Sequence, residues 1–180
     1  MLLFLLTLPV VLLLFLIFMV QFIRYKMNRI AWPKKSLLLL AFMSSVCVGS
    51  FLVNYYFFTF NTIDRTNMQE GRLHVKSPDG EWSASSYYEL YGGAPGGVNV
   101  WVEVTNEQTT ETKIVYYADA KQDVSLTWED NQMLTIRNED QYNNATTTVN
   151  VQKDIYDEFG RACRSIAMRG QYEYCYQADE

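Results

Sequence analysis

The pattern of apolar and polar residues changes character near residue 60. Before that point lie two long apolar runs, 2–23 and 37–58, and beyond it apolar residues recur at every second position of short segments. Each run exceeds the roughly 20 residues that a helix needs to cross a bilayer, and lipid offers the backbone no other hydrogen-bond partner. The pattern predicts a two-helix transmembrane hairpin over 1–60, with helices over about 2–23 and 37–58, and a β domain over 61–180.

The apolar runs admit two other interpretations. Two buried helices of a soluble protein would need an apolar surface to pack on, which the polar second half does not offer. A cleaved signal peptide begins with a positive segment and ends in small residues. Here the apolar run starts directly after Met1 and ends in Gln21-Phe-Ile-Arg24. We therefore expect both segments to persist as membrane helices.

Charge is distributed unequally between the two halves. Residues 1–60 contain no Asp or Glu, and their only charges are five basic residues, namely Arg24, Lys26, Arg29, Lys34 and Lys35. All 20 acidic residues lie in 61–180, together with the remaining 15 − 5 = 10 basic ones, so this half carries about −10. Short loops rich in Lys and Arg stay in the cytoplasm. The predicted topology has a cytoplasmic loop over 24–36, with the N-terminus and the β domain on the outer side of the plasma membrane.

The second apolar run carries small residues on one helical face. Ala41, Ser45 and Gly49 are spaced by four, and small residues in this arrangement allow another helix to approach closely. The partner could be the first helix, a second copy of the chain or a separate membrane protein. The oligomeric state is left open.

The second half alternates with period two, which is typical of strands with one buried face. Val98, Val100, Val102 and Val104 alternate with more polar residues, and turn sequences such as Ser77-Pro-Asp-Gly80 separate the segments. Six or seven strands result, so we expect an all-β domain (α+β at most), a small antiparallel sandwich or open barrel. A helical turn is expected over 153–159.

The cysteines suggest a disulfide rather than catalysis. Cys163 and Cys175 lie in the half that we place on the oxidising side, where pairing is favoured. Cys47 lies in the middle of the second helix and is interpreted as a packing residue. No C-x-x-C motif is present.

Candidate catalytic chemistry is sparse. His74 is the only histidine, which disfavours a zinc site and a histidine-based triad. An acidic domain repels nucleic acid. We predict no cofactor, no metal and no catalytic residue, and keep a carboxylate or serine hydrolase as a minor alternative.

Aromatic residues are the best candidates for a binding surface. Adjacent residues on a strand point to opposite faces, so part of each tyrosine pair should be exposed. The candidates are Tyr87, Tyr88, Trp101, Tyr116 and Tyr117. The leading hypothesis is a non-enzymatic, membrane-tethered binding or accessory module that engages a protein or envelope component. The alternative is an accessory subunit of a larger membrane complex that packs through its second helix. The lipid bilayer is a partner in either case.

Several short motifs occur together in a particular order. They are Ser77-Pro-Asp-Gly-Glu-Trp82, Gly92-Gly-Ala94, Val98–Val104, Trp128-Glu-Asp-Asn131, Leu134-Thr-Ile136 and Val151–Asp157. This order resembles a family of short, mainly Gram-positive bacterial membrane-anchored domains of unknown function, over roughly residues 70–157. The resemblance implies an envelope location and no catalytic residues. The chain departs from the pattern at Pro95-Gly96-Gly97, lacks an Arg-Gly dipeptide in the second strand, and adds the tail that carries Cys163 and Cys175.

Overall fold

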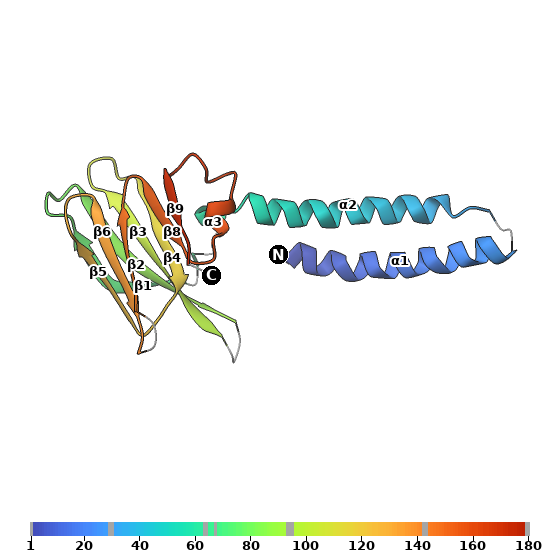
Figure 1. The fold of residues 1–180 in the computed structure, drawn as a ribbon, viewed down its shortest axis with the longest axis horizontal. Coiled ribbons are helices and arrows are strands. Elements are labelled where there is room, and N and C mark those ends of the chain that lie inside the picture. The colour runs from blue at the N-terminus through green and yellow to red at the C-terminus, as the bar shows by residue number, and fades with distance from the viewer. Residues whose placement is uncertain are drawn as a thin grey trace. The chain divides into compact units, whose positions relative to one another are not determined.

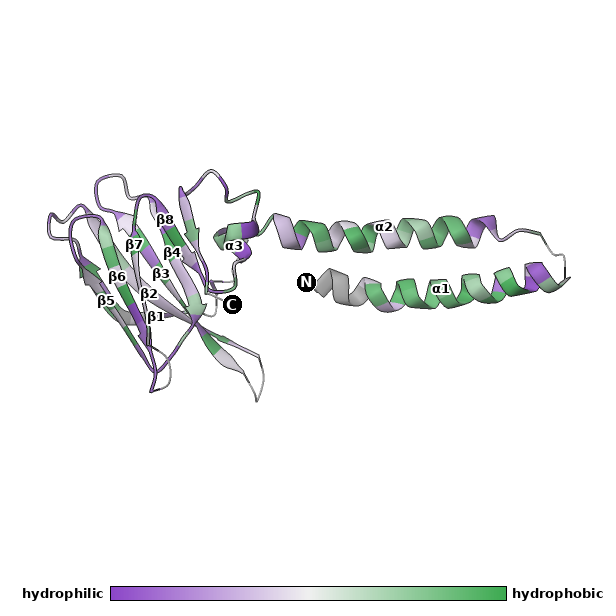
Figure 2. Cartoon of the chain, viewed as in Figure 1, coloured by the Kyte–Doolittle hydropathy of each residue, from purple (hydrophilic) through white to green (hydrophobic). Residues whose placement is uncertain are grey.

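The computed structural model describes residues 2–28, 31–62, 65–66, 68–92, 96–141 and 144–178. Its contacts divide the chain into two units, Met1–Phe57 and Phe58–Glu180. The first unit consists of helices α1 (Leu2–Asn28) and α2 (Lys34–Tyr56), shown in Figure 1. Both are long and apolar enough to cross a membrane, and Figure 2 shows the hydrophobic residues that run along them.

Both helices extend beyond the apolar runs on the side of their connection, whereas α2 ends at Tyr56, before the end of its run. Arg24 and Lys26 lie in the last turns of α1, and Lys34 and Lys35 lie in the first turn of α2. The expected loop over 24–36 is therefore too long, because Arg and Lys are good helix formers and continue the helix at little cost. Arg29, the fifth basic residue, lies outside the described residues.

The two helices pack against each other along one side of α2. The Ser36 hydroxyl donates a hydrogen bond to the Gln21 side chain, and the Trp32 ring meets Tyr25 edge-on, with 5.2 Å between ring centroids. Cys47 is buried in the hairpin, as a packing residue would be. The side of α2 that faces α1 thus carries Ser36 and Cys47.

The second unit contains nine strands within the described residues. They are β1 (Met68–Lys76), β2 (Trp82–Tyr91), β3 (Gly97–Asn106), β4 (Thr112–Asp119), β5 (Asp123–Trp128), β6 (Met133–Glu139), β7 (Asn144–Asn150), β8 (Asp154–Asp157) and β9 (Tyr174–Tyr176). A large sheet has the order β1-β2-β3-β4-β8-β9, and a small sheet has the order β5-β6-β7. Short helices η1 (Phe60–Thr62) and α3 (Arg161–Arg164) complete the unit.

The strand count and one expected element need correction. The sequence predicted six or seven strands, but β8 and β9 are short strands that its alternation did not reveal. The helical turn expected over 153–159 is wrong, because β8 pairs in parallel with β4, with Tyr156 opposite Tyr116. Parallel pairing needs a partner from a distant part of the chain, and local sequence does not show it. The domain is an open sandwich, with no closed barrel in the described part.

Two hydrophobic cores lie on opposite faces of the large sheet. The sandwich core fills the space between the sheets, where Val100, Val102 and Val104 of β3 meet Leu134 and Ile136 of β6. The second core lies on the outer face of the large sheet and contains eight buried residues, namely Phe58, Phe60, Trp101, Ile114, Tyr117, Ile155, Ala162 and Met168. The large sheet is therefore covered on both faces.

Candidate binding cleft

An aromatic row crosses the outer face of the large sheet. Tyr87 of β2 is paired with Trp101 of β3, which is paired with Tyr117 of β4. The Trp101 and Tyr117 ring centroids are 5.1 Å apart. Period-two alternation places these side chains on the face opposite Val100 and Val102.

Three of the five aromatic residues expected to form an exposed surface are buried. Trp101 is 1% exposed, Tyr116 1% and Tyr117 6%, so the prediction is wrong for them. Trp101 and Tyr117 lie in the second core, whereas Tyr116 lies in the sandwich core, where its ring stacks on Tyr156 at 5.0 Å. The prediction failed because it assumed that one face of the sheet is solvated.

Tyr87 and Tyr88, the other two candidates, are half-buried on opposite faces of β2. Tyr88 packs against the sandwich core and Tyr87 against the second core. Exposed aromatic residues do occur in the domain, at Tyr91, Phe159, Tyr174 and Tyr176. The sequence offered no basis for preferring these four.

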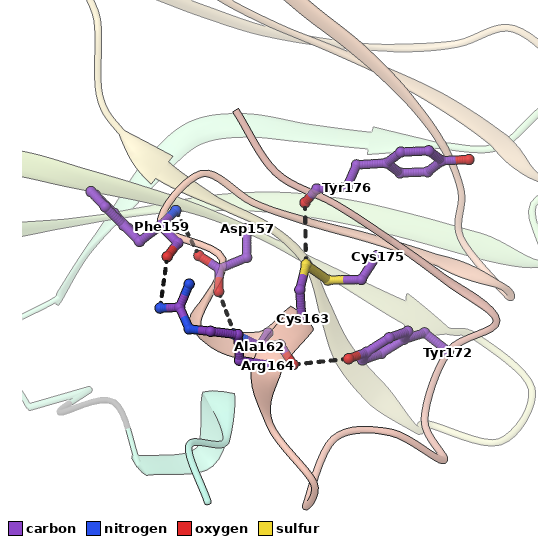
Figure 3. Close-up of a disulfide and its surroundings, with 8 residues drawn as sticks. All are labelled: Asp157, Phe159, Ala162, Cys163, Arg164, Tyr172, Cys175 and Tyr176. Atoms are coloured by element: carbon purple, nitrogen blue, oxygen red, sulfur yellow. Dashed lines mark hydrogen bonds between the residues drawn. A yellow bond between two sulfur atoms is a disulfide. The ribbon is translucent and has the colours of Figure 1, made fainter. Parts of the chain in front are cut away.

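The C-terminal segment, which runs from α3 to β9, covers part of the outer face and contains a disulfide. Cys163 and Cys175 are bonded, with 5.4 Å between their Cα atoms, as the sequence analysis expected (Figure 3). The Tyr172 hydroxyl donates to the Ala162 carbonyl at 2.8 Å. The Asp157 carboxylate accepts the Ala162 N–H at 2.5 Å, which holds the start of α3 against the end of β8. Burial raises the pKa of Asp157 despite the hydrogen bonds from the Ala162 and Phe159 N–H groups.

The segment that follows α2 packs against this C-terminal segment. Phe58 and Phe60 are each 4% exposed, although α2 ends only at Tyr56. The Ser165 hydroxyl donates to the Phe58 carbonyl at 2.5 Å, and the Arg161 guanidinium lies 4.3 Å from the centre of the Phe58 ring. We call residues 58–62 the juncture, and they form part of the β unit.

A cleft of about 300 Å³ opens beside the juncture on the outer face of the large sheet. Its lining residues come from the segment before β1 and from strands β1 to β4, namely Arg65, Met68, Glu70, Tyr87, Trp101, Glu103 and Ile114. A second cavity of about 520 Å³ shares Arg65 and Ile114 with it, so the two are adjacent. The C-terminal segment supplies Met168, Gly170 and Gln171 to the wall of the second cavity.

Charged groups surround an apolar floor in the first cleft. The Arg65 guanidinium lies 2.8 Å from the Glu103 carboxylate, and the two side chains are 49% and 13% exposed. Burial raises the pKa of the Tyr87 phenol, and the negative charges of Glu103 and Glu70 raise it further. In the second cavity, burial lowers the pKa of Lys113. The cleft is thus a partly desolvated site with a negative potential that Arg65 offsets.

Trp101 lines the first cleft with an unsatisfied donor. Its indole N–H is buried and has no hydrogen-bond partner among the residues that the structure describes. Buried donors without a partner are rare and are often found at functional sites. The sequence singled out Trp101 but none of Arg65, Glu70 and Glu103, because Arg65 and Glu103 are separated by 38 positions and no local motif connects them.

The single histidine pairs with a serine on the neighbouring strand. His74 Nδ1 lies 2.9 Å from the Ser85 hydroxyl oxygen, which the sequence did not predict. A nucleophilic serine needs an acid that orients the histidine and donors that stabilise an oxyanion. The nearby Glu107 carboxylate is engaged by Ser83 and Lys76. His74 and Ser85 lie opposite each other on the paired strands β1 and β2, and neither residue lines the cavities described above. The pair fits a polar cross-strand contact.

No metal-binding cluster is found in the part of the chain that the structure describes. Two acidic residues of the sequence motifs, Asp79 and Asp130, hold turns. Asp79 accepts the Ser77 hydroxyl at 2.6 Å and the Glu81 N–H at 3.0 Å. Asp130 accepts the N–H groups of Gln132 and Met133, both at 2.7 Å. Asp79 and Asp130 therefore stabilise turns of the sandwich.

The small residues of α2 do not face α1. Ala41 and Ser45 are exposed, and Ser45 donates to the Ala41 carbonyl at 2.9 Å. Gly49 is half-buried and has open space where a Cβ would lie. The structure thus removes the first helix from the three candidate partners of this face.

The comparisons with known proteins give a family but no activity. A model described as a family of unknown function, DUF5412, matches residues 32–161. The chain belongs to the DUF5412 family. The match covers α2 and the β domain as far as Arg161, so the disulfide of this DUF5412 protein lies beyond the matched region. Neither the curated proteins nor the solved structures gave a match.

Proposed function

We propose that this DUF5412 protein is a membrane-anchored binding module of the bacterial cell envelope, and that its partner enters the cleft on the outer face of the large sheet. The observation that carries the proposal is the cleft itself, where the Trp101 indole N–H, which has no partner within the described part of the chain, lies among the charges of Arg65, Glu70 and Glu103. Concave sites that combine an apolar lining with a few polar groups are the usual binding sites of proteins.

The location is part of the proposal. Two helices long and apolar enough to cross a membrane precede the domain, and basic residues lie where they are joined. Short basic connections stay in the cytoplasm, which would place the β domain outside the plasma membrane. The disulfide fits an oxidising compartment. Because the sequence motifs resemble those of mainly Gram-positive bacterial domains, the proposed envelope is that of a Gram-positive bacterium.

The cleft also supports a weaker catalytic alternative, because Glu70 and Glu103 both line it. Hydrolysis by two carboxylates requires one of them to serve as a general acid in an apolar setting. The Glu103 carboxylate instead forms an ion pair with the Arg65 guanidinium at 2.8 Å. The ion pair favours binding over hydrolysis.

The test is site-specific photo-crosslinking with the full chain in membranes. A photoreactive residue replaces Met68 in the cleft, and a matched probe replaces Gln108 in the exposed turn after β3. We expect a discrete crosslinked product from position 68 that Glu70→Gln weakens, and none from position 108. Equal products from both positions, or none from position 68, would contradict a binding cleft. Bond cleavage in a candidate glycan that Glu103→Gln abolishes would favour the hydrolase.

A second candidate function uses α2. Ala41 and Ser45 line an open groove of about 730 Å³ with Leu38 and Phe42, on the side of α2 away from α1. An accessory subunit of a larger membrane complex would pack there. Ala41→Leu should then shift the migration of the complex in native gels, whereas Leu52→Ala, at an exposed position elsewhere on α2, should not. Unchanged migration of both variants would count against this candidate.

A further inference from the structure

The cleft already contains one cation, and the chain itself supplies it. The Arg65 guanidinium lies 2.8 Å from a Glu103 carboxylate oxygen. Arg65 belongs to no strand or helix and precedes β1, whereas Glu103 is held within β3. The acceptor is therefore fixed by the sheet, and the donor comes from a connecting segment.

The surroundings of this guanidinium suit a cation. Glu70 brings a second carboxylate to the cleft, and Tyr87 and Trp101 bring aromatic rings. Aromatic faces attract ammonium and guanidinium groups, and carboxylates bind guanidinium through paired hydrogen bonds. Two carboxylates against one guanidinium leave the lining with an excess negative charge. That excess also contributes to the raised pKa of Tyr87.

Arg65 is weakly held compared with the groups that surround it. Its side chain is 49% exposed, whereas that of Glu103 is 13% exposed. An ion pair with an exposed partner typically contributes little to stability. A competing guanidinium that reached Glu103 would therefore displace Arg65 at little cost, and it could add contacts with Glu70 and the rings.

We propose that the cleft is a receptor site for an arginine side chain of a partner polypeptide, and that Arg65 occupies the site in its absence. The inference rests on the proposed function and specifies its ligand chemistry. Arg65 serves as the model for the bound group, because it shows that a guanidinium reaches Glu103 in this fold. Binding then exchanges one guanidinium for another, and Arg65 lowers the apparent affinity by its own occupancy.

The experiment measures small-molecule binding to the full chain in detergent micelles by calorimetry. The probes are N-acetyl-arginine amide and its neutral counterpart N-acetyl-citrulline amide. Arg65→Gln empties the site, and Arg137→Gln removes a comparable guanidinium from the exposed Arg137–Glu139 pair of the small sheet. We expect the arginine probe to bind Arg65→Gln roughly threefold to fivefold more tightly than wild type, which corresponds to the loss of an exposed ion pair. Arg137→Gln should match wild type.

Two further variants locate the site. Glu103→Gln in the Arg65→Gln background should abolish the gain in affinity for the arginine probe. Glu70→Gln in the same background should weaken this gain, and it keeps the test valid if the Glu103→Gln variant folds poorly. Binding should also shift the indole N–H resonance that Trp101→Phe removes. Equal affinity of wild type and Arg65→Gln for the arginine probe would overturn the inference. Equal binding of the citrulline probe would overturn it as well, while the crosslinking from position 68 would still support a binding cleft.

Discussion

Gly71 lies where the regular pairing of β1 with β2 is interrupted, between Glu70 and His74. A Cβ at this position would clash with the Ser86 hydroxyl and lie 2.7 Å from Tyr88 Cε2 and 3.0 Å from the Ser86 carbonyl oxygen. The backbone of β2 cannot move without disturbing its pairing with β3. Position 71 therefore has room only for glycine.

We expect Gly71→Ala to lower the free energy of unfolding of the β domain by about 1–3 kcal/mol, because the added methyl group overpacks the site. Thermal unfolding followed by near-ultraviolet circular dichroism measures the change. Gly170→Ala is the matched control, since nothing lies within 4 Å of a Cβ there. Equal melting of the two variants would contradict the steric argument.

Asp157 and Asp79 should respond to pH in opposite directions. Burial raises the pKa of Asp157 above 3.8, so its contribution to stability is present at low pH and declines as the pH rises through the raised value. The Ser77 hydrogen bond lowers the pKa of Asp79, so its contribution is present above 3.8 and is lost as the pH falls. The destabilisation by Asp157→Asn should shrink with rising pH, and that by Asp79→Asn should grow. Denaturant titrations between pH 3 and 6 test this, and parallel pH profiles would refute it.

At the scale of elements, the C-terminal segment determines that the outer face of the large sheet is covered. It places Ala162 and Met168 over the outer face, where they bury Trp101 and Tyr117 together with Phe58 of the juncture. The disulfide closes this segment across a separation of 12 residues. The family match ends at Arg161, so the rest of the C-terminal segment lies beyond the residues that the family model matches.

Cys163→Ser with Cys175→Ser should lower stability by about 2–4 kcal/mol, because the open chain gains conformational freedom in the unfolded state. The loosening should be local. Amide hydrogen exchange should accelerate in β8, β9 and the juncture, whereas the valines of β3 that face the sandwich core should stay protected. Uniform acceleration across both sheets would show that the segment is integral to the sandwich instead.

At the scale of the whole molecule, the two units differ in the solvent that suits them. The helices, along which hydrophobic residues run (Figure 2), expose apolar side chains, whereas the β unit buries many of its apolar residues in two cores. The change occurs between Tyr56, where α2 ends, and Phe58, which is already buried in the second core. Only Phe57 separates the helix from the domain along the chain.

The proposed topology can be tested by a reporter fusion. Alkaline phosphatase, which is active only after export, should be active when fused after Glu180, and a fusion within the connection at Trp32 should be inactive. Replacing Lys34 and Lys35 by Gln should reduce the difference, because these residues contribute to the charge bias. An inactive C-terminal fusion of a stable, full-length protein would place the domain on the cytoplasmic side.

The sequence by itself determined the two apolar helices, the strands with clear alternation, their turns and the cysteine pair, because each depends on neighbouring residues or on simple chemistry. Only the tertiary structure decided that the outer face of the large sheet is covered as well, since that depends on the juncture and on a tail that lies some 60 positions from β3. The same long-range packing buried Trp101 and Tyr117, brought Arg65 to Glu103, and turned Ala41 and Ser45 away from α1. A period of two reports that a strand has two faces, but the parts of the chain that cover each face are far away in sequence.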